Sequence, residues 1–291
     1  MRIVVLSDIH GNVKALEAVL ADIRREAAPD AIFVAGDLTL VGPRPAEALA
    51  LVRTIEGARF VRGNCDQYII DREPSDVVQF VIDRLSDDDM AFVEALPFAQ
   101  QLSAGQHELL VVHANPKDLE TPIKPETHES QILPLLEGVS ADLVAFGHYH
   151  VPFVRRVGRW TLADIASVGK PCDGDTRAVY AMFTLGAAGW QIEHRRVAFD
   201  VEAVAPPFPP VGFPNTGQRA GALRGWRFYN DMAQDTAHRL PRTGAFRDER
   251  DLCSLKRDRP RPPQQNWRST WLPPPTSNES WFHGDPAPTS I

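Results

Sequence analysis

Five segments of the chain end in residues that bind metal ions or catalyse hydrolysis, and each follows a short apolar run. In order they are Asp8-Ile9-His10, Gly36-Asp37, Gly63-Asn64, His113 and Gly147-His148-Tyr149-His150. Each has an ordinary explanation when taken alone, such as a helix cap, a buried histidine bonded to a carbonyl group, or a polar turn. Five together are harder to explain in this way, because an unpaired polar group in an apolar setting costs about 1–3 kcal/mol. A shared cation would remove that cost.

The combined donor set fits two metal ions better than one. The candidate ligands are Asp8, His10, Asp37, Asn64, His113, His148 and His150. A single Zn²⁺ prefers four ligands, whereas two ions that share a bridging carboxylate accommodate a larger mixed set. Imidazole together with carboxylate favours two divalent transition metal ions (Mn, Fe, Zn, Ni or Co) over Ca or Mg. In an extended segment, residues i and i+2 face the same side, so Asp8 and His10 have a geometry suited to metal binding.

An alternation of strands and helices would bring these residues together. Short β-branched runs predict strands at 2–6, 31–36, 58–63, 108–114 and 142–148, and apolar spacing predicts helices at 12–28, 45–55 and within 75–96. Asn12 is a suitable N-cap and Pro45 suits a first helical turn. This order predicts an α/β domain over residues 1–205, with mixed sheets and helices on the outer faces. Such sheets bind ligands at the carboxyl ends of their strands.

The last part of this domain has a different pattern. Residues 159–168, 178–185 and 190–197 predict a late run of antiparallel strands, with turns at 169–175 and 186–189.

The overall composition is that of a globular protein, with 43% hydrophobic and 24% charged residues among 291. A formal net charge of -7 makes nucleic acid an unexpected partner. The three cysteines, Cys65, Cys172 and Cys253, form no CxxC pair, so neither a zinc ribbon nor a disulfide framework is expected. The first apolar run is too short for a signal peptide, and no run approaches the roughly 18 residues that span a bilayer. We therefore expect a cytoplasmic location and no membrane partner.

Residues 206–291 differ in composition from the rest of the chain. They hold 14 of the 25 prolines, and their twelve Lys and Arg outnumber eight Asp and Glu. Such a segment buries too little apolar surface to offset its ordering entropy, so we expect it to be disordered. Three alternatives stay open: a proline-rich ligand for a partner domain, an Arg-rich RNA-binding tail, and an altered reading frame at the gene end.

The motifs "SDIHGN", "GDL", "GNCD", "VVHA" and "GHYH" resemble, in order and spacing, those of the calcineurin-like metallophosphoesterases, which are written DxH, GD, GNH(D/E), H and GHxH. The resemblance covers about residues 1–200. Within the superfamily, "GDLTLVGPRPAEAL", "GNCD" and "ASVGKPCDGDTRAVYAMF" are similar to the YfcE-type phosphodiesterases of bacteria and archaea. The resemblance implies a four-layer α/β/β/α sandwich of two packed mixed sheets.

The resemblance also implies a role for each ligand. Asp8, His10 and His150 would hold one ion, Asn64, His113 and His148 the other, and Asp37 would bridge them. A hydroxide between the ions would attack phosphorus in line, and this mechanism agrees with the chemistry of two-metal sites. The resemblance therefore implies catalytic roles for Asp37 and His10.

Three further residues are candidates at the site. Asp66 would orient a ligand or assist protonation, with a local turn bond as the alternative, and Asn12 would contact phosphate, with a helix cap as the alternative. Asn64 and Cys65 are also assigned to substrate binding. Cys65 occupies the position of the family's GNH histidine, which is read as a general acid or a phosphoryl contact. A thiol with a pKa of about 8.5 is a poor substitute, so the expected substrates have good leaving groups.

The expected function is that of a dimetal phosphoesterase, and specifically a phosphodiesterase that acts on small or nucleotide phosphodiesters, with Mn²⁺ as the metal in vitro. The alternatives are a non-catalytic protein-interaction scaffold on the same fold, a phosphoprotein phosphatase and a dinucleoside polyphosphate hydrolase. All seven ligand positions are filled, which favours the enzyme over the scaffold. One departure from the family pattern is Leu40, where an Asp commonly follows the bridging carboxylate.

Overall fold

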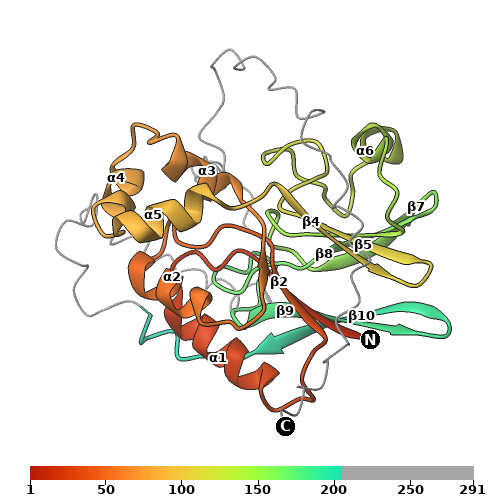
Figure 1. Cartoon of the computed structure of the whole chain (residues 1–291), viewed down its shortest axis with the longest axis horizontal. Helices are drawn as coiled ribbons and strands as arrows, with labels where there is room; N and C mark the ends of the chain where they lie inside the picture. Colours follow the sequence, from red (N-terminus) through yellow and green to blue (C-terminus); the bar gives the residue numbers. More distant parts are fainter. Residues whose placement is uncertain (205–291) are drawn as a thin grey trace, which may run out of the picture. The chain divides into compact units, whose positions relative to one another are not determined.

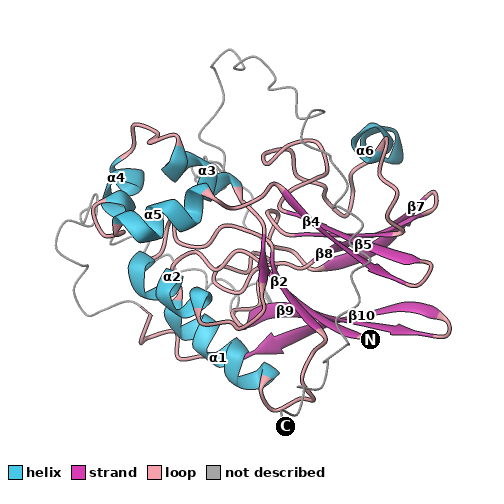
Figure 2. Cartoon of the chain, viewed as in Figure 1, coloured by secondary structure: helices cyan, strands magenta, loops and turns pink. Residues whose placement is uncertain are grey.

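The computed structural model describes residues 1–204, so the expectations for the Pro- and Arg-rich segment 206–291 lie outside the described residues (Figure 1). Within residues 1–204, two five-stranded sheets pack against each other and helices cover their outer faces (Figure 2). The strand order is β10-β9-β1-β2-β3 in the first sheet and β4-β5-β6-β8-β7 in the second. The predicted four-layer arrangement of two mixed sheets is therefore confirmed.

The first sheet is parallel at its centre and antiparallel on one side. It consists of β1 (Arg2–Leu6), β2 (Ala31–Val34), β3 (Arg59–Phe60), β9 (Ala178–Gly186) and β10 (Gly189–Val197). The strands β1, β2 and β3 run parallel, and β9 pairs antiparallel with both β1 and β10. Parallel pairing places the carboxyl ends of β1, β2 and β3 at the same edge of the sheet.

The second sheet also contains three parallel strands, and here they lie at its centre. It consists of β4 (Ala99–Ala104), β5 (His107–Val112), β6 (Leu143–Phe146), β7 (Phe153–Val157) and β8 (Trp160–Asp164). The strands β5, β6 and β8 are parallel, while β4 and β7 pair antiparallel at the two edges.

This topology corrects the expected late run of antiparallel strands. Only β9 and β10 form the predicted hairpin, because β8 belongs to the other sheet and runs parallel to β6. The predicted turn at 169–175 lies within a longer connection, residues 165–177, that passes from one sheet to the other. An apolar run predicts that a strand forms, but its pairing partner depends on tertiary packing that the run does not encode.

Helices follow the strands of the first sheet. They are α1 (Val13–Ile23) and α2 (Pro45–Arg53), and both pack on the outer face of that sheet. The Oδ1 atom of Asn12 accepts a hydrogen bond from the amide of Ala15 at 3.1 Å, which confirms the predicted N-cap. The first helix ends five residues before the predicted end at 28, since apolar spacing stops at Ile23 and Pro29 disfavours helical geometry before it.

The described residues also contain four shorter helices: α3 (Asn64–Ile70), α4 (Asp76–Ile82), α5 (Asp87–Glu94) and α6 (Glu129–Leu136). The last of them covers the outer face of the second sheet through Ile132 and Leu136. Among residues 1–204, no helix has the length and apolar character needed to cross a membrane.

The space between the sheets is filled by apolar side chains from both of them. These include Ile3, Val5 and Phe33 from the first sheet and Leu109, Val111 and Leu143 from the second. Burial of each such side chain stabilises the fold by about 1.5–3 kcal/mol. This packing fixes the distance between the two sheets and therefore between the polar segments that follow their strands.

The packing between the sheets predicts unequal effects for the same substitution at two positions. Leu109 is fully buried between the sheets, so Leu109→Ala should lower the free energy of unfolding by about 2–5 kcal/mol through lost burial and a cavity. Leu133 on α6 is 43% exposed, and Leu133→Ala should change it by less than about 0.5 kcal/mol. Urea denaturation measures both, and equal losses would contradict this account of the core.

Candidate metal centre

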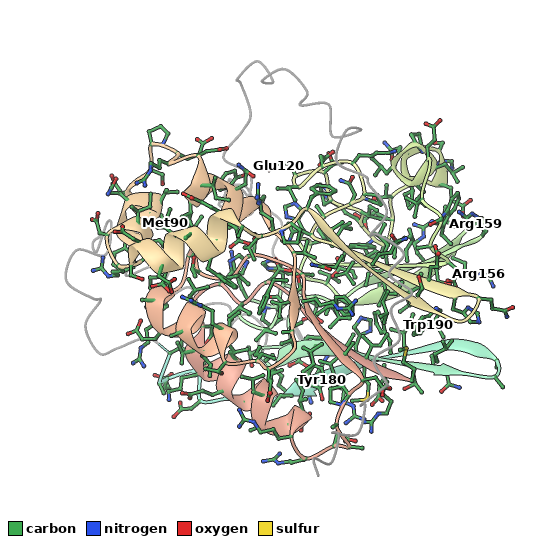
Figure 3. All side chains as sticks on the ribbon, viewed as in Figure 1. Met90, Glu120, Arg156, Arg159, Tyr180 and Trp190 are labelled. Atoms are coloured by element: carbon green, nitrogen blue, oxygen red, sulfur yellow. The ribbon has the colours of Figure 1, made fainter. Side chains whose placement is uncertain are left out.

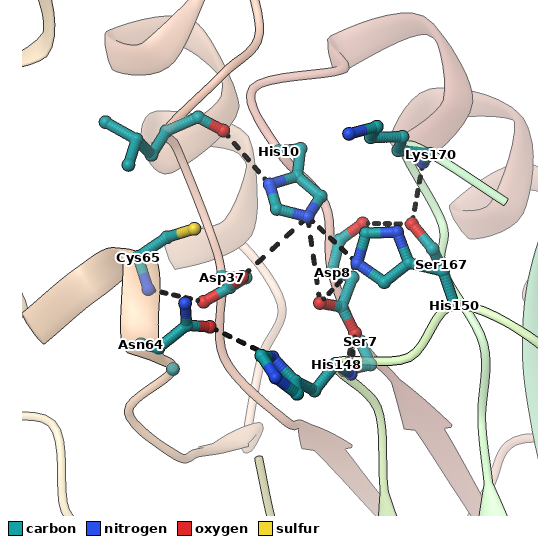
Figure 4. Close-up of polar contacts among 12 residues, drawn as sticks. Ser7, Asp8, His10, Asp37, Asn64, Cys65, His148, His150, Ser167 and Lys170 are labelled. Atoms are coloured by element: carbon teal, nitrogen blue, oxygen red, sulfur yellow. Dashed lines mark hydrogen bonds and ion pairs between the residues drawn. The ribbon is translucent and has the colours of Figure 1, made fainter. Parts of the chain in front are cut away.

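The seven predicted ligands lie together where the two sheets meet. They follow β1, β2, β5 and β6 or begin α3, so every predicted strand end contributes to one place (Figure 4). Six of the seven are buried, and only His148 is partly accessible. Charged and polar groups are expensive to bury unless they are paired or bind a metal. Their convergence therefore requires a compensating interaction.

The backbone at these positions adopts an uncommon conformation. The φ angles are positive at Asp8 (55°), His10 (50°), Asp37 (56°), His148 (68°) and His150 (63°). Non-glycine residues rarely adopt this conformation, and strain of about 1–3 kcal/mol per residue is typical of functional sites. The finding also corrects one step of the sequence argument, since Asp8 and His10 converge through left-handed turns and not through an extended segment.

The first group of donors contains Asp8, His10 and His150. The Nε2 atom of His150 lies 3.0 Å from Asp8 Oδ1 and 3.2 Å from His10 Nε2. One ligand atom from each residue lies within 4.8 Å of the other two. A carboxylate and two imidazoles around a common point form a donor set suited to a transition metal ion.

The second group contains Asn64, His113 and His148. The Oδ1 atom of Asn64 lies 2.9 Å from His113 Nε2 and 3.2 Å from His148 Nδ1. Asp37 lies between the two groups, because its Oδ1 is 3.4 Å from His113 Nε2 and its Oδ2 is 3.8 Å from His10 Nε2. Each carboxylate oxygen of Asp37 thus faces a histidine of a different group.

Backbone carbonyl groups orient three of the imidazoles. The Nδ1 atoms of His10 and His113 face the carbonyl oxygens of Leu40 (3.0 Å) and Ala35 (2.8 Å), and Nε2 of His148 faces that of Glu120 (3.0 Å). A nitrogen that faces a carbonyl carries the proton, so in each neutral ring the other nitrogen presents its lone pair to the centre. This arrangement is typical of metal-binding histidines.

The electrostatics of the site show a need for positive charge. The pKa of His10 is lowered to about 3, mainly by burial and then by repulsion from His150. The pKa of His148 is also lowered to about 3, mainly by burial and then by repulsion from His113. Burial would raise the pKa of Asp8, but the neighbouring histidines outweigh it and lower that pKa. The imidazoles of His10 and His148 are therefore neutral, whereas, against the effect of burial, Asp37 raises the pKa of His113 and Asp8 raises that of His150. The carboxylates thus stabilise positive charge at the centre, and a bound cation would supply it. The residues fit a metal centre on this ground.

Two candidates outside the ligand set have well-defined partners. The carboxylate of Asp66 accepts from the amides of Asp37 (2.9 Å), Leu38 (3.1 Å) and Gly63 (2.8 Å), and thereby holds the bridging candidate in place. The side chain of Asn12 caps α1 and donates to the carbonyl of Gly169 at 3.0 Å. A catalytic role for Asp66 and a phosphate contact for Asn12 stay predictions.

The sequence reasoning missed two residues that position ligands. Ser7 donates to Asp8 Oδ2 at 2.6 Å, which leaves Oδ1 directed at His150. Glu120, on the loop before α6 (Figure 3), accepts through its carboxylate from the hydroxyl of Tyr68 at 2.8 Å, while its carbonyl holds His148. Ser7 adjoins the DxH motif and could have been noticed. Glu120 lies in a loop without a motif, so no sequence signal identified it.

Comparisons with known proteins identify the family of this chain. The family model of the calcineurin-like phosphoesterase superfamily domain matches residues 1–187. An uncharacterized protein of Methanocaldococcus jannaschii is 28% identical over 225 residues, which are 69% of this chain and 88% of that protein. A metallophosphoesterase from Sphaerobacter thermophilus has a similar structure, with 25% identity, a TM-score of 0.62, and coverage of 80% of this chain and 100% of its own.

A hypothetical protein of Pyrococcus horikoshii also shares the fold. Its sequence identity is 19% and its TM-score is 0.61, with 70% of this chain and 90% of the other covered.

The close approach of α3 to β2 predicts that Gly63 is needed for metal binding. A methyl group at Gly63 would overlap with the Asp37 carboxylate and amide. Gly63→Ala should therefore displace Asp37 and weaken Mn²⁺ binding by about tenfold or more. Gly186→Ala is the matched control, because a methyl group there meets no neighbouring atom. Isothermal titration calorimetry compares the two, and unchanged affinity in Gly63→Ala would refute the close packing.

Proposed function

Because the chain belongs to the calcineurin-like phosphoesterase superfamily, we propose that it is a dimetal-dependent phosphodiesterase that hydrolyses small or nucleotide phosphodiesters. The observation that carries the proposal is the convergence of seven donors, six of them buried, in two groups with Asp37 between them. A non-catalytic scaffold would gain nothing from five strained ligand positions and a buried cluster of ionisable groups. The complete donor set therefore favours the enzyme.

The proposed assignment of ligands follows the two groups. Asp8, His10 and His150 hold one divalent ion, and Asn64, His113 and His148 hold the other, with Asp37 shared. When bound, such a pair lowers the pKa of water and neutralises charge on the phosphoryl oxygens. The first-row metals with affinity for imidazole and carboxylate are the candidates, and Mn²⁺ is the choice for assays in vitro.

Residues of the chain prepare the site for this chemistry. Hydrogen bonds from the amide of Cys65 to Asp37 (2.9 Å) and from Ser7 to Asp8 fix the two carboxylates, so that little reorganisation accompanies the reaction. His10 is held by its bond to the carbonyl of Leu40, which sets the direction of its other nitrogen. Positioning of this kind is a large part of catalysis at phosphate esters.

One feature favours diesters over monoesters, and a second favours good leaving groups. The Glu120 carboxylate accepts from the hydroxyl of Tyr68, which accepts from the side-chain amide of Asn64, and its charge would repel a second negative charge on a monoester. Cys65 stands where similar enzymes have a histidine, so help for the leaving group is reduced. We expect activity to be highest with esters whose leaving groups depart readily.

The proposal predicts a metal-dependent activity on an activated diester. Protein loaded with Mn²⁺ should hydrolyse bis-p-nitrophenyl phosphate, and at least roughly fivefold more efficiently than the monoester p-nitrophenyl phosphate, since one pairwise repulsion near a surface is worth about 1 kcal/mol or more. Chelation should abolish turnover, and added metal should restore it. Release of p-nitrophenolate measures the rate. Absence of turnover with each of Mn, Co, Ni, Zn and Fe would refute the enzyme assignment.

The bridging position predicts the effect of removing one carboxylate. Asp37→Ala should lower kcat/KM for the diester by roughly 10²–10³ or more, because both groups of donors lose a shared ligand. Asp83→Ala removes an exposed carboxylate at the end of α4 and should leave kcat/KM unchanged. Circular dichroism confirms that both variants are folded. A full rate in folded Asp37→Ala would exclude a shared ligand role.

A further inference from the structure

Cys65 lies at the boundary between the metal centre and an apolar cluster. It is the second residue of α3 and is fully buried, and one side of it packs with Leu40, Tyr68 and Ile69. A cysteine in such a place is often only a small apolar side chain. The other side of this residue faces His10 and Asp37 of the metal centre.

The sulfur atom belongs to a third group of metal-binding atoms. Cys65 Sγ, a ring nitrogen of His10 and a carboxylate oxygen of Asp37 all lie within 4.8 Å of one another, and all three residues are fully buried. Figure 4 shows the sulfur of Cys65 pointing from α3 toward His10, with the Asp37 carboxylate close to the start of the same helix. Ligand atoms of a tetrahedral Zn²⁺ site lie about 3.3–3.8 Å apart, given bond lengths of about 2.0–2.3 Å. Side-chain movement of about one ångström is sufficient to reach this geometry.

The other two members of this group, His10 and Asp37, are held in place by hydrogen bonds. The Nδ1 atom of His10 is bonded to the carbonyl of Leu40, so its Nε2 faces Asp37 at 3.8 Å. The Asp37 carboxylate is bonded at Oδ1 to the amide of Cys65 itself, at 2.9 Å. The backbone of Cys65 is thus fixed relative to the carboxylate, and only the direction of its side chain has to change.

We propose that Cys65 is a thiolate ligand of the ion held by His10 and Asp37, which makes this half of the centre a mixed sulfur, nitrogen and oxygen site. The proposal rests on the occupancy of the metal centre proposed above. On binding, the S–H bond breaks, the proton passes to solvent, and a sulfur–metal bond forms. The residue then serves as a ligand at the position where similar enzymes have a histidine.

A sulfur ligand changes which metal the site prefers. Thiolate is a soft donor and favours Zn²⁺, whereas Mn²⁺ prefers oxygen donors. Cys65→Ser should therefore weaken Zn²⁺ binding by about tenfold or more, and Mn²⁺ binding by less than about threefold. Competition titrations with a chelating dye measure both constants. Equal losses for the two metals would count against sulfur ligation.

The direct test is a spectrum that does not depend on activity. Full-length protein with Cys172→Ser and Cys253→Ser retains Cys65 as its one cysteine. Cys172 is exposed, and its sulfur lies 3.6 Å from Nδ1 of His150, so serine preserves a polar group there. Loaded with Co²⁺, this variant should show a near-ultraviolet band for charge transfer from thiolate to cobalt. A further substitution in this variant, Cys65→Ser or Cys65→Ala, should remove the band while cobalt stays bound.

The outcomes separate this inference from the proposed function. Two bound cobalt ions without the charge-transfer band would overturn the role of Cys65 and leave the dimetal centre intact. A protein that binds no cobalt in equilibrium dialysis would overturn both. Because the first measurement retains Cys65, it gives an answer even where a Cys65 variant fails to fold.

Discussion

The structure depends on the accumulation of ionisable side chains that are buried from solvent. Asp8, Asp37 and Asp66 are fully buried beside the histidines of the centre. Charges of this kind are tolerated only where they are paired and hydrogen-bonded. Backbone amides and one hydroxyl hold the carboxylates, and backbone carbonyls hold three of the imidazoles. The oxygens Asn64 Oδ1 and Asp8 Oδ1 face imidazole nitrogens of the centre, and a cation bound between these atoms would satisfy both kinds of donor.

The two-sheet fold is what makes this pattern possible. Each sheet contributes a set of parallel strands whose carboxyl ends lie at one edge, and the apolar core between the sheets holds the two edges together. Glycine allows the segments that follow β1 and β6 to approach each other closely, since a methyl group at Gly147 would overlap with the side chains of Ser7 and Asp8. Packing far from the centre therefore controls the distances between ligands, and the strained turns at the strand ends direct their side chains.

The sequence predicted the strands, the capped first helix and the place where the ligands meet, because these depend on local patterns and short motifs. It did not predict that β8 joins the second sheet or that α3 begins within the motif at Asn64, since both depend on contacts between distant segments. The extended segment predicted at Asp8 and His10 was also wrong, because the spacing of a motif does not determine the φ angles of its residues. Glu120 was missed since its contacts, to Tyr68 and His148, cross the fold from a loop.

The stretch Gly63-Asn64-Cys65-Asp66 shows why residue type and position must be considered together. Four consecutive residues serve the same carboxylate or its neighbours: the first permits close approach, the second meets two histidines, and the fourth bonds the amide of Asp37. The third bonds Asp37 through its amide, so any residue except proline would serve there equally well as backbone. What distinguishes Cys65 is its side chain alone, and a sulfur atom among nitrogen and oxygen donors alters the choice of metal more directly than it alters the fold.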